Sequence, residues 1–152
     1  MSTQEAEAAD PKKVRVLYTA EATAVGGRRG HAKTSDGRLE VSFSSPAELG
    51  GDGGPGTNPE QLFALGFAAC YQNAMLGIAM RKGLEANDST VTAKVGFGPI
   101  AAGRFSFDIE LLIHLPSVLA AADAEALIHE ADLRCPYSNA VRDNVNVTLT
   151  LV

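Results

Sequence analysis

The sequence predicts a single α+β domain in which antiparallel strands surround a long apolar helix. Three observations support this fold class. Runs of alternating apolar and polar residues lie both before and after the centre of the chain, residues 62–80 form a 19-residue stretch without a charge, and only one other segment has the pattern of a helix. Strands that come in groups, without a helix between each pair, favour α+β over a βαβ fold. A chain of 152 residues suits one domain.

The N-terminal segment is polar and acidic. Residues 1–13, MSTQEAEAADPKK, have no apolar stretch of the kind found in a secretory signal and no Arg-rich pattern of a transit peptide. We therefore expect a disordered tail over 1–13, one domain over 14–152, and a cytoplasmic protein. The 13 Lys and Arg against 18 Asp and Glu give a net charge of -5 with no basic stripe, so nucleic acid is not an expected partner.

The first part of the domain is predicted to be a β-meander. Residues 14–25 alternate as a strand does, a Gly-rich turn follows, and Ser35-Asp36-Gly37 forms a second turn before the alternating run 39–43. Residues 49–57, LGGDGGPGT, are a flexible loop. This loop contains G-x-G-x-x-G, but Pro55 and the antiparallel context oppose a dinucleotide site.

The apolar helix has clear start and stop signals. Asn58 is a good N-cap, Pro59 suits the first helical position, and Gln61 stands where a capping-box partner belongs. Lys82-Gly83 is the expected end. Further elements are a strand in TVTAKVGF, a strand over 105–113 with every second residue apolar, a helix over 123–133 capped by Asp123, and a final strand over 145–152.

The length of the uncharged helix raises the question of a membrane span. Nineteen residues reach the usual threshold, but Gln72 and Asn73 lie in the middle and the run is rich in Ala and Gly, so we reject that interpretation. A helix that is apolar on every side must be covered on every side. About five short strands are too few to do so, and we therefore predict an obligate homodimer with these helices at its centre.

Several classes of site find no support in the residue pattern. The three histidines, His31, His114 and His129, have no metal-ligand spacing to one another or to a cysteine, and no Gly-x-Ser-x-Gly motif indicates a serine hydrolase. We expect neither a metal nor a cofactor. The two cysteines of a chain without export signals do not indicate a structural disulfide.

Cys70, in the middle of the apolar helix, is open to two interpretations. A buried cysteine is commonly a small hydrophobe of the core, and an apolar setting that includes Phe63 and Phe67 should raise its pKa. A nearby arginine would reverse this by stabilising the thiolate. Arg28 and Arg29 are the candidates, and Glu60 would orient the guanidinium in a cluster with Cys70. Ten helical residues span roughly 15 Å, so such a cluster would most easily take some members from a partner chain.

Cys135 has its own two interpretations. Pro136 restricts Cys135 to an extended backbone and is able to start a short helix, which would put the sulfur near a positive helix end. Taken alone, Cys135 could equally be an ordinary turn cysteine.

Together, the segments YTAEATAVGGRRG, NPEQLFALGFAACY and CPYSNA closely resemble the organic hydroperoxide resistance (Ohr) branch of the Ohr/OsmC family. The resemblance implies an intertwined homodimer and a thiol peroxidase without metal or flavin. It implies that Cys70 is the peroxidatic cysteine, Cys135 the resolving cysteine, Arg28 the arginine of the Gly-Gly-Arg turn and Glu60 its carboxylate partner. Because the arginine is doubled here, alignment alone selects Arg28 over Arg29.

The resemblance also implies a reaction. A Cys70 sulfenic acid would form an intrachain disulfide with Cys135, which dihydrolipoamide or a lipoylated protein would reduce. Phe63 and Phe67 would form an apolar wall that suits alkyl or fatty-acyl hydroperoxides. The alternatives are an OsmC-type peroxidase of wider specificity, a thiol redox sensor that does not turn over, and a dimer that binds a small ligand.

Overall fold

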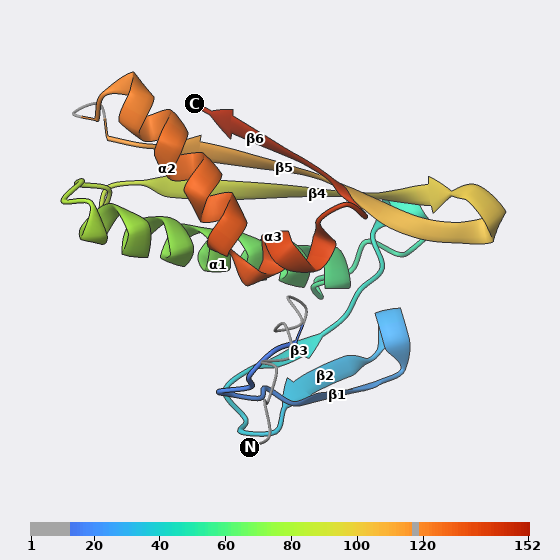
Figure 1. Cartoon of the computed structure of the whole chain (residues 1–152). Coiled ribbons are helices and arrows are strands. Elements are labelled where there is room, and N and C mark those ends of the chain that lie inside the picture. The colour runs from blue at the N-terminus through green and yellow to red at the C-terminus, as the bar shows by residue number, and fades with distance from the viewer. Residues whose placement is uncertain (1–12, 117–118) are drawn as a thin grey trace, which may run out of the picture.

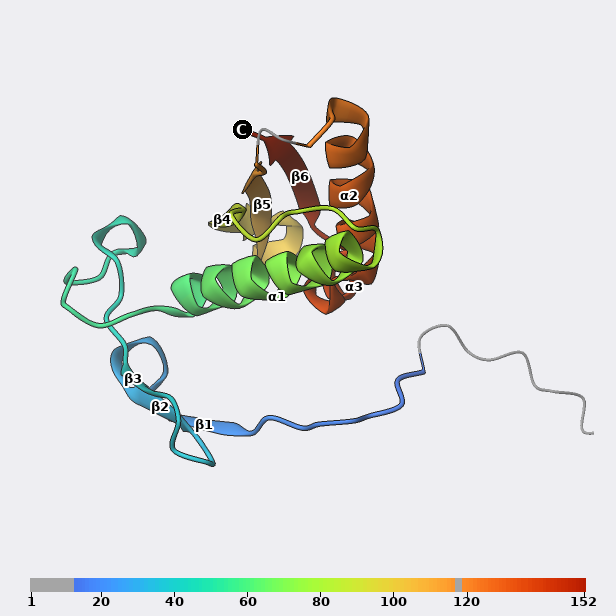
Figure 2. The same cartoon turned by 90° about the vertical axis from the view of Figure 1, so that its left-hand side faces the viewer.

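The computed structural model describes residues 13–116 and 119–152, so the tail predicted over 1–13 falls almost wholly outside the described residues. The described chain contains two three-stranded sheets. The first sheet has the order β1-β2-β3 and is antiparallel, with β1 at Ala22–Val25, β2 at His31–Thr34 and β3 at Glu40–Ser42. It stands apart from the rest of the molecule, as Figures 1 and 2 show from two sides.

The first strand is shorter than predicted. Residues 14–21 have no strand partner within the described chain, and Val14, Val16, Leu17 and Tyr18 are 66–83% exposed. An extended segment becomes a strand only where a neighbour exchanges backbone hydrogen bonds with it. Within the described chain, β2 pairs on its β1 side with residues 22–25 alone, so the extended segment before Ala22 has no neighbour to bond with.

The second sheet forms the core with the helices. It pairs β4, Thr90–Ile100, with β5, Arg104–His114, in antiparallel register, and β5 with β6, Asn146–Leu151. The predicted antiparallel pairing is confirmed for β4 and β5 but does not hold for β5 and β6, which are parallel. The reason is the connection: α2, Ala121–Arg134, and α3, Pro136–Val141, carry the chain back to the end where β5 began.

The central helix α1 spans Pro59–Arg81. Its predicted N-cap is confirmed, since the Asn58 side chain accepts a hydrogen bond of 2.8 Å from the Gln61 backbone N–H. The Gln61 side chain does not complete a capping box, because Thr57 Oγ1 donates to it at 2.8 Å. Gly83, with φ of 68°, follows the last turn as predicted.

The second long helix begins earlier than predicted. α2 starts at Ala121, and its N-cap, Ala120, makes no side-chain capping bond. Asp123 therefore lies in the first turn and is not the cap. A carboxylate there still interacts favourably with the positive end of the helix.

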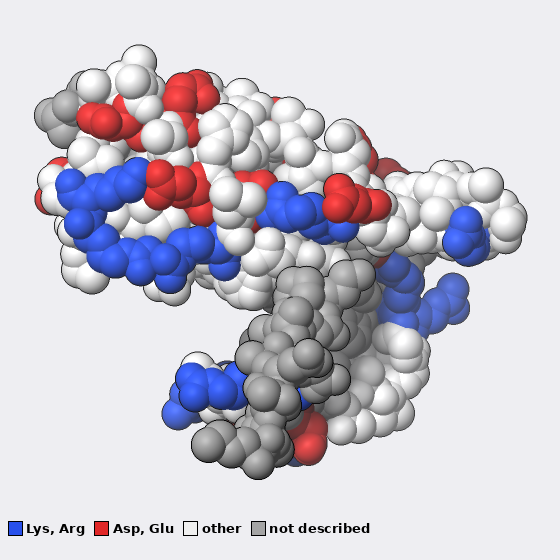
Figure 3. Space-filling model, in the orientation of Figure 1, with Lys and Arg blue, Asp and Glu red and all other residues white. Residues whose placement is uncertain are grey.

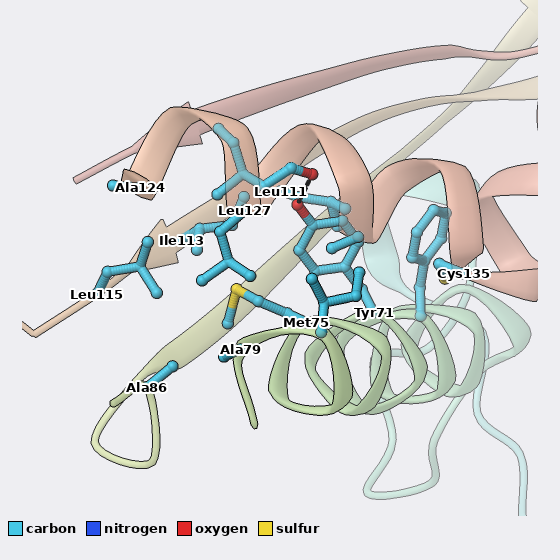
Figure 4. Close-up of a cluster of buried hydrophobic side chains, with 14 of the residues drawn as sticks. Tyr71, Met75, Ala79, Ala86, Leu111, Ile113, Leu115, Ala124, Leu127 and Cys135 are labelled. Carbon is cyan, nitrogen blue, oxygen red and sulfur yellow. Dashed lines mark hydrogen bonds between the residues drawn. The ribbon is translucent and has the colours of Figure 1, made fainter. Parts of the chain in front are cut away.

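One face of α1 carries the hydrophobic core. Its buried residues recur at helical spacing and pack on β4 and α2: Phe67, Tyr71, Met75, Ile78 and Ala79. Figure 4 shows Tyr71 and Met75 pointing toward Leu111 and Leu127, with Cys135 at one end of the cluster. The Tyr71 hydroxyl donates a 2.7 Å hydrogen bond to the Ile128 carbonyl, which satisfies the one polar atom of this side chain.

The rest of α1 is apolar but not covered. The helix is long and apolar enough to cross a membrane, yet one helix of this kind is weak support for a span, and its inner face packs as a core helix does. Only 28% of its apolar window is buried, and Leu65 and Met80 are 69% and 77% exposed. The single chain thus leaves an open apolar surface along its longest helix.

Candidate functional site

Arg28 is held by the turn that connects β1 and β2. This turn is a 3-10 segment, Gly27–Arg29, entered through Gly26 with φ of 82°. Gly30 closes it so tightly that a Cβ at this position would lie 1.7 Å from the Val25 carbonyl oxygen. Only glycine fits there, and the tight loop fixes where Arg28 leaves the backbone.

Glu60, in the first turn of α1, receives this arginine. The two Nη atoms of Arg28 donate to the two carboxylate oxygens of Glu60, at 2.9 and 2.5 Å. The hydrogen bond from Arg28 lowers the pKa of Glu60, and the same bond raises the pKa of Arg28. A bidentate pair of this kind restrains both the position and the orientation of a guanidinium.

A third group touches the same guanidinium. The Cζ atom of Arg28 lies over the ring of Phe97, 5.2 Å from its centroid. Phe97 is in β4 between two glycines and stacks on Phe105 of β5 with ring centroids 5.2 Å apart. The sequence pattern places Phe97 in a strand and predicts no role for it; the flanking glycines of Gly-Phe-Gly are its one unusual feature.

An aromatic cluster runs from Phe97 toward the cysteines. Phe107 lies 6.4 Å from Phe97 and 5.1 Å from Phe63, measured between ring centroids. Tyr137 of α3 lies 5.6 Å from both Phe63 and Phe67. The two phenylalanines predicted for the substrate wall are therefore in one cluster, and Phe107 and Tyr137 are members that the sequence did not reveal.

Cys70 and Cys135 lie next to each other. Cys70 is half-buried in α1, and Cys135, which is fully buried, precedes α3. Pro136 does start the short helix, as predicted. Burial raises the pKa of Cys70, the charge and a hydrogen bond of the Cys135 thiol raise it further, and the Tyr137 backbone N–H lowers it. Both thiols are free, and the effect of Cys135 on the pKa of Cys70 shows that the two groups interact.

In the described chain the Arg28–Glu60 ion pair and the Cys70–Cys135 pair do not interact directly with each other. Arg28 interacts with Glu60 and Cys70 with Cys135, while neither arginine of the turn is among the groups that shift the pKa of Cys70 within residues 13–116 and 119–152. Arg29 instead lines a separate cavity of 400 Å³ with Phe43 and Asp52. The structure thus distinguishes the doubled arginines: Arg28 is the one that pairs with Glu60.

Another cavity opens beside the ion pair. It has a volume of about 380 Å³, and its lining combines Glu60 with apolar side chains that include Leu49, Ala64 and Phe97. Glu48, Asn58 and Gln61 line it as well, so the cavity has a mixed polar and apolar surface. Among the described residues, no group of three or more His, Cys, Asp or Glu side chains is arranged to hold a metal ion.

Comparison with known proteins identifies the family. A family model described as OsmC-like protein matches residues 50–150. An organic hydroperoxide resistance protein of Xanthomonas axonopodis pv. citri is 49% identical over 144 residues, which are 94% of this chain and 99% of the relative. The chain belongs to the organic hydroperoxide resistance branch of the OsmC-like family.

Solved structures of organic hydroperoxide resistance proteins share the fold. The protein from Elizabethkingia anophelis, with thiocyanate bound, is 42% identical and superposes with a TM-score of 0.86 over 91% of this chain and 98% of that one. OhrB of Bacillus subtilis is 38% identical, with a TM-score of 0.81 over 90% and 100% of the two chains. The family model spans Glu60, Cys70 and Cys135 but begins after Arg28.

Proposed function

We propose that this member of the organic hydroperoxide resistance family is a thiol peroxidase that reduces alkyl or fatty-acyl hydroperoxides to alcohols. The observation that carries the proposal is the placement of the Cys70 thiol beside the Cys135 thiol, at one end of an aromatic cluster. Two adjacent free thiols can exchange two electrons with a peroxide, and the cluster provides an apolar surface for the organic part of the substrate.

The reaction has two steps in the protein. The Cys70 thiolate attacks one peroxide oxygen, the O–O bond breaks, and the alkoxide takes a proton and leaves as the alcohol, so that Cys70 becomes a sulfenic acid. The Cys135 sulfur then attacks Cys70, water leaves, and a disulfide forms. A dithiol outside the protein, for which the family resemblance suggests dihydrolipoamide or a lipoylated protein, restores both thiols by donating two electrons.

The thiolate requires a positive charge that the isolated chain does not place near it. Burial raises the pKa of Cys70, so the thiol form dominates in a single chain. In our proposal a second copy covers the exposed face of α1 and completes the site, so that an Arg28 guanidinium held by Glu60 stabilises the thiolate and the departing alkoxide. The open apolar surface around Leu65 and Met80 supports such a homodimer.

The aromatic cluster bears on substrate choice. Phe63, Phe107 and Tyr137 meet at ring-centroid distances of 5.1 to 5.6 Å and form one apolar patch between the thiols and Phe97. Hydrogen peroxide gains nothing from such a patch, whereas an alkyl chain loses its contact with water there. We therefore propose an organic substrate and a cytoplasmic site of action, where dithiol reductants are available.

A peroxidase assay with several substrates and donors tests this function. The purified protein is given cumene hydroperoxide, tert-butyl hydroperoxide or hydrogen peroxide, with dihydrolipoamide or with reduced thioredoxin as electron donor. We expect sustained turnover with dihydrolipoamide and a higher kcat/KM for the two organic peroxides. Equal kcat/KM for all three would indicate an OsmC-type enzyme of wider specificity, and a single oxidation without turnover would indicate a sensor.

A further inference from the structure

Phe97 contacts the guanidinium of Arg28, although it lies outside both cysteine motifs. The guanidinium of Arg28 has two partners in the structure: the Glu60 carboxylate, which holds its Nη edge, and the Phe97 ring, which lies 5.2 Å from Cζ. A cation over an aromatic face is attracted by the ring quadrupole, and arginine is the cation most often found there. The carboxylate constrains the guanidinium along its edge, and the ring constrains it across its plane.

The ring is itself held in place. Phe97 stacks on Phe105 with an angle of 6° between the ring planes, and it meets Phe107 across the β4–β5 pair, where these two residues are directly opposite in register. A side chain braced by two rings of the neighbouring strand loses little further freedom when the arginine docks on it.

The surroundings of the guanidinium make this contact significant. The Arg28 side chain is 36% exposed while that of Glu60 is 12% exposed, so one part of the arginine remains in solvent. A long side chain with a free edge has several rotamers of similar energy unless a second contact selects one. Phe97 and Glu60 also line the same 380 Å³ cavity, so both partners of the guanidinium border one cavity.

We infer that Phe97 is a positioning residue, whose ring holds the Arg28 guanidinium in the orientation that catalysis requires. This inference rests on the proposed function, because Arg28 matters to the rate only if the protein is a peroxidase of the kind described above. It predicts that loss of the Phe97 ring has a different effect on kcat/KM from the loss of an apolar substrate contact. Loosening the arginine impairs the reduction of every peroxide, whereas removing a substrate wall impairs only the large organic ones.

The test compares Phe97→Leu, which keeps an apolar side chain but removes the ring quadrupole, with Phe97→Tyr, which keeps the quadrupole. Ile100→Leu, on the same strand and 48% exposed, is the matched control. For Phe97→Leu we expect kcat/KM to fall about three- to tenfold, by the same factor for cumene hydroperoxide and hydrogen peroxide, the range a cation–π contact would produce. Phe97→Tyr and Ile100→Leu should remain within twofold of the wild-type protein.

A second measurement does not depend on activity. The ring current of Phe97 should shift the NMR signals of the Arg28 δ-methylene protons, and this shift should disappear in Phe97→Leu and persist in Phe97→Tyr. A loss in Phe97→Leu that is confined to cumene hydroperoxide would overturn the inference and make Phe97 a substrate contact. An unchanged kcat/KM in Phe97→Leu, together with a large loss in Arg28→Lys, would overturn it as well.

A different result would show that the proposed peroxidase mechanism itself is wrong. If Arg28→Lys reduces peroxides as fast as the wild-type protein, then the arginine has no catalytic role and the peroxidase mechanism itself is wrong. The NMR shift would remain informative in that case, because it reports the contact between Arg28 and Phe97 and not the reaction.

Discussion

The ion pair between Arg28 and Glu60 connects the two parts of the molecule. Arg28 belongs to the turn of the first sheet and Glu60 to the first turn of α1, and two hydrogen bonds join them. Because the first sheet stands apart from the core, this pair is one of its specific links to the rest of the chain (Figure 2). The same interaction that presents the arginine thus also fixes the sheet that carries it.

This pair should make stability depend on pH. The pKa of Glu60 is lowered in the folded protein, so its contribution is complete above the unfolded value, about 4.3, and is lost as the pH falls through the lower folded value. We expect Glu60→Gln to reduce the free energy of unfolding by about 0.5–1 kcal/mol at pH 7, a small value because solvent screens the partly exposed arginine. Urea unfolding of both proteins at pH 7 and pH 3 measures this, and the difference should shrink at pH 3.

The two cysteines should have different roles. We expect Cys70→Ser to abolish peroxide reduction, because serine cannot supply the sulfur that is oxidised. In Cys135→Ser the first equivalent of peroxide should oxidise Cys70 to the sulfenic acid, and further equivalents should convert it to the sulfinic and sulfonic acids, since no second thiol traps the sulfenic acid. Intact mass spectrometry after timed peroxide addition measures both results. Equal loss of the first oxidation in both variants would contradict the assigned order.

Phe63 should select for organic peroxides. Its ring contacts three other aromatic rings, those of Phe67, Phe107 and Tyr137. Phe63→Ala removes much of the apolar patch, and we expect kcat/KM for cumene hydroperoxide to fall about tenfold, equivalent to about 1.4 kcal/mol of lost transition-state binding. The value for hydrogen peroxide should change less than twofold. Steady-state kinetics with both substrates, after circular dichroism has confirmed folding, gives the comparison.

The exposed face of α1 should mediate self-association. We expect the double variant Leu65→Glu, Met80→Glu to shift the protein from dimer to monomer, because two charges on the apolar face would have to lose their hydration in the interface. Leu133→Glu, on α2 and 66% exposed, is the matched control. Sedimentation velocity measures the masses. A wild-type monomer at micromolar concentration would contradict the homodimer proposal.

Gly66 should be required for the approach of α3 to α1. A Cβ at Gly66 would lie 2.3 Å from the Tyr137 hydroxyl oxygen and 2.9 Å from Cζ, so Gly66→Ala must displace the Tyr137 ring. The backbone N–H of Tyr137 interacts with Cys70, and Cys135 is two residues away. We expect disulfide formation to slow severalfold while the first oxidation is less affected, as stopped-flow measurement of both phases would show. Gly77→Ala, with no atom within 4 Å of its added Cβ, is the control.

Local sequence patterns predicted most of the elements. The start of α1 at Asn58, its end at Lys82-Gly83 and the short helix after Cys135 follow from capping residues and proline, whose effects act over a few residues. The parallel pairing of β5 with β6 was not predicted, because the direction of a strand depends on the path of the helices before it. The length of β1 was overestimated, since alternation indicates the capacity to pair but not the presence of a partner.

The site was predictable to the extent that its residues carry unusual chemistry. Sulfur and charge are conspicuous beside an apolar helix, which is why the sequence points to Cys70, Cys135, Arg28 and Glu60. The family resemblance then implies which role each of them has. Aromatic residues are common in strands and cores, so nothing in the sequence distinguishes Phe97, Phe107 and Tyr137. Only the three-dimensional arrangement shows that they line up between the arginine and the thiols.

The unequal burial of the two cysteines has a consequence for how the proposed disulfide would be reduced. Cys135 has no exposed surface, whereas Cys70 is accessible in part. An incoming thiolate must approach along the axis of the sulfur–sulfur bond, and only the Cys70 side of that bond faces outward. If the proposed disulfide forms, we expect the reductant to attack the Cys70 sulfur and form its mixed disulfide there, with the Cys135 thiolate as the leaving group.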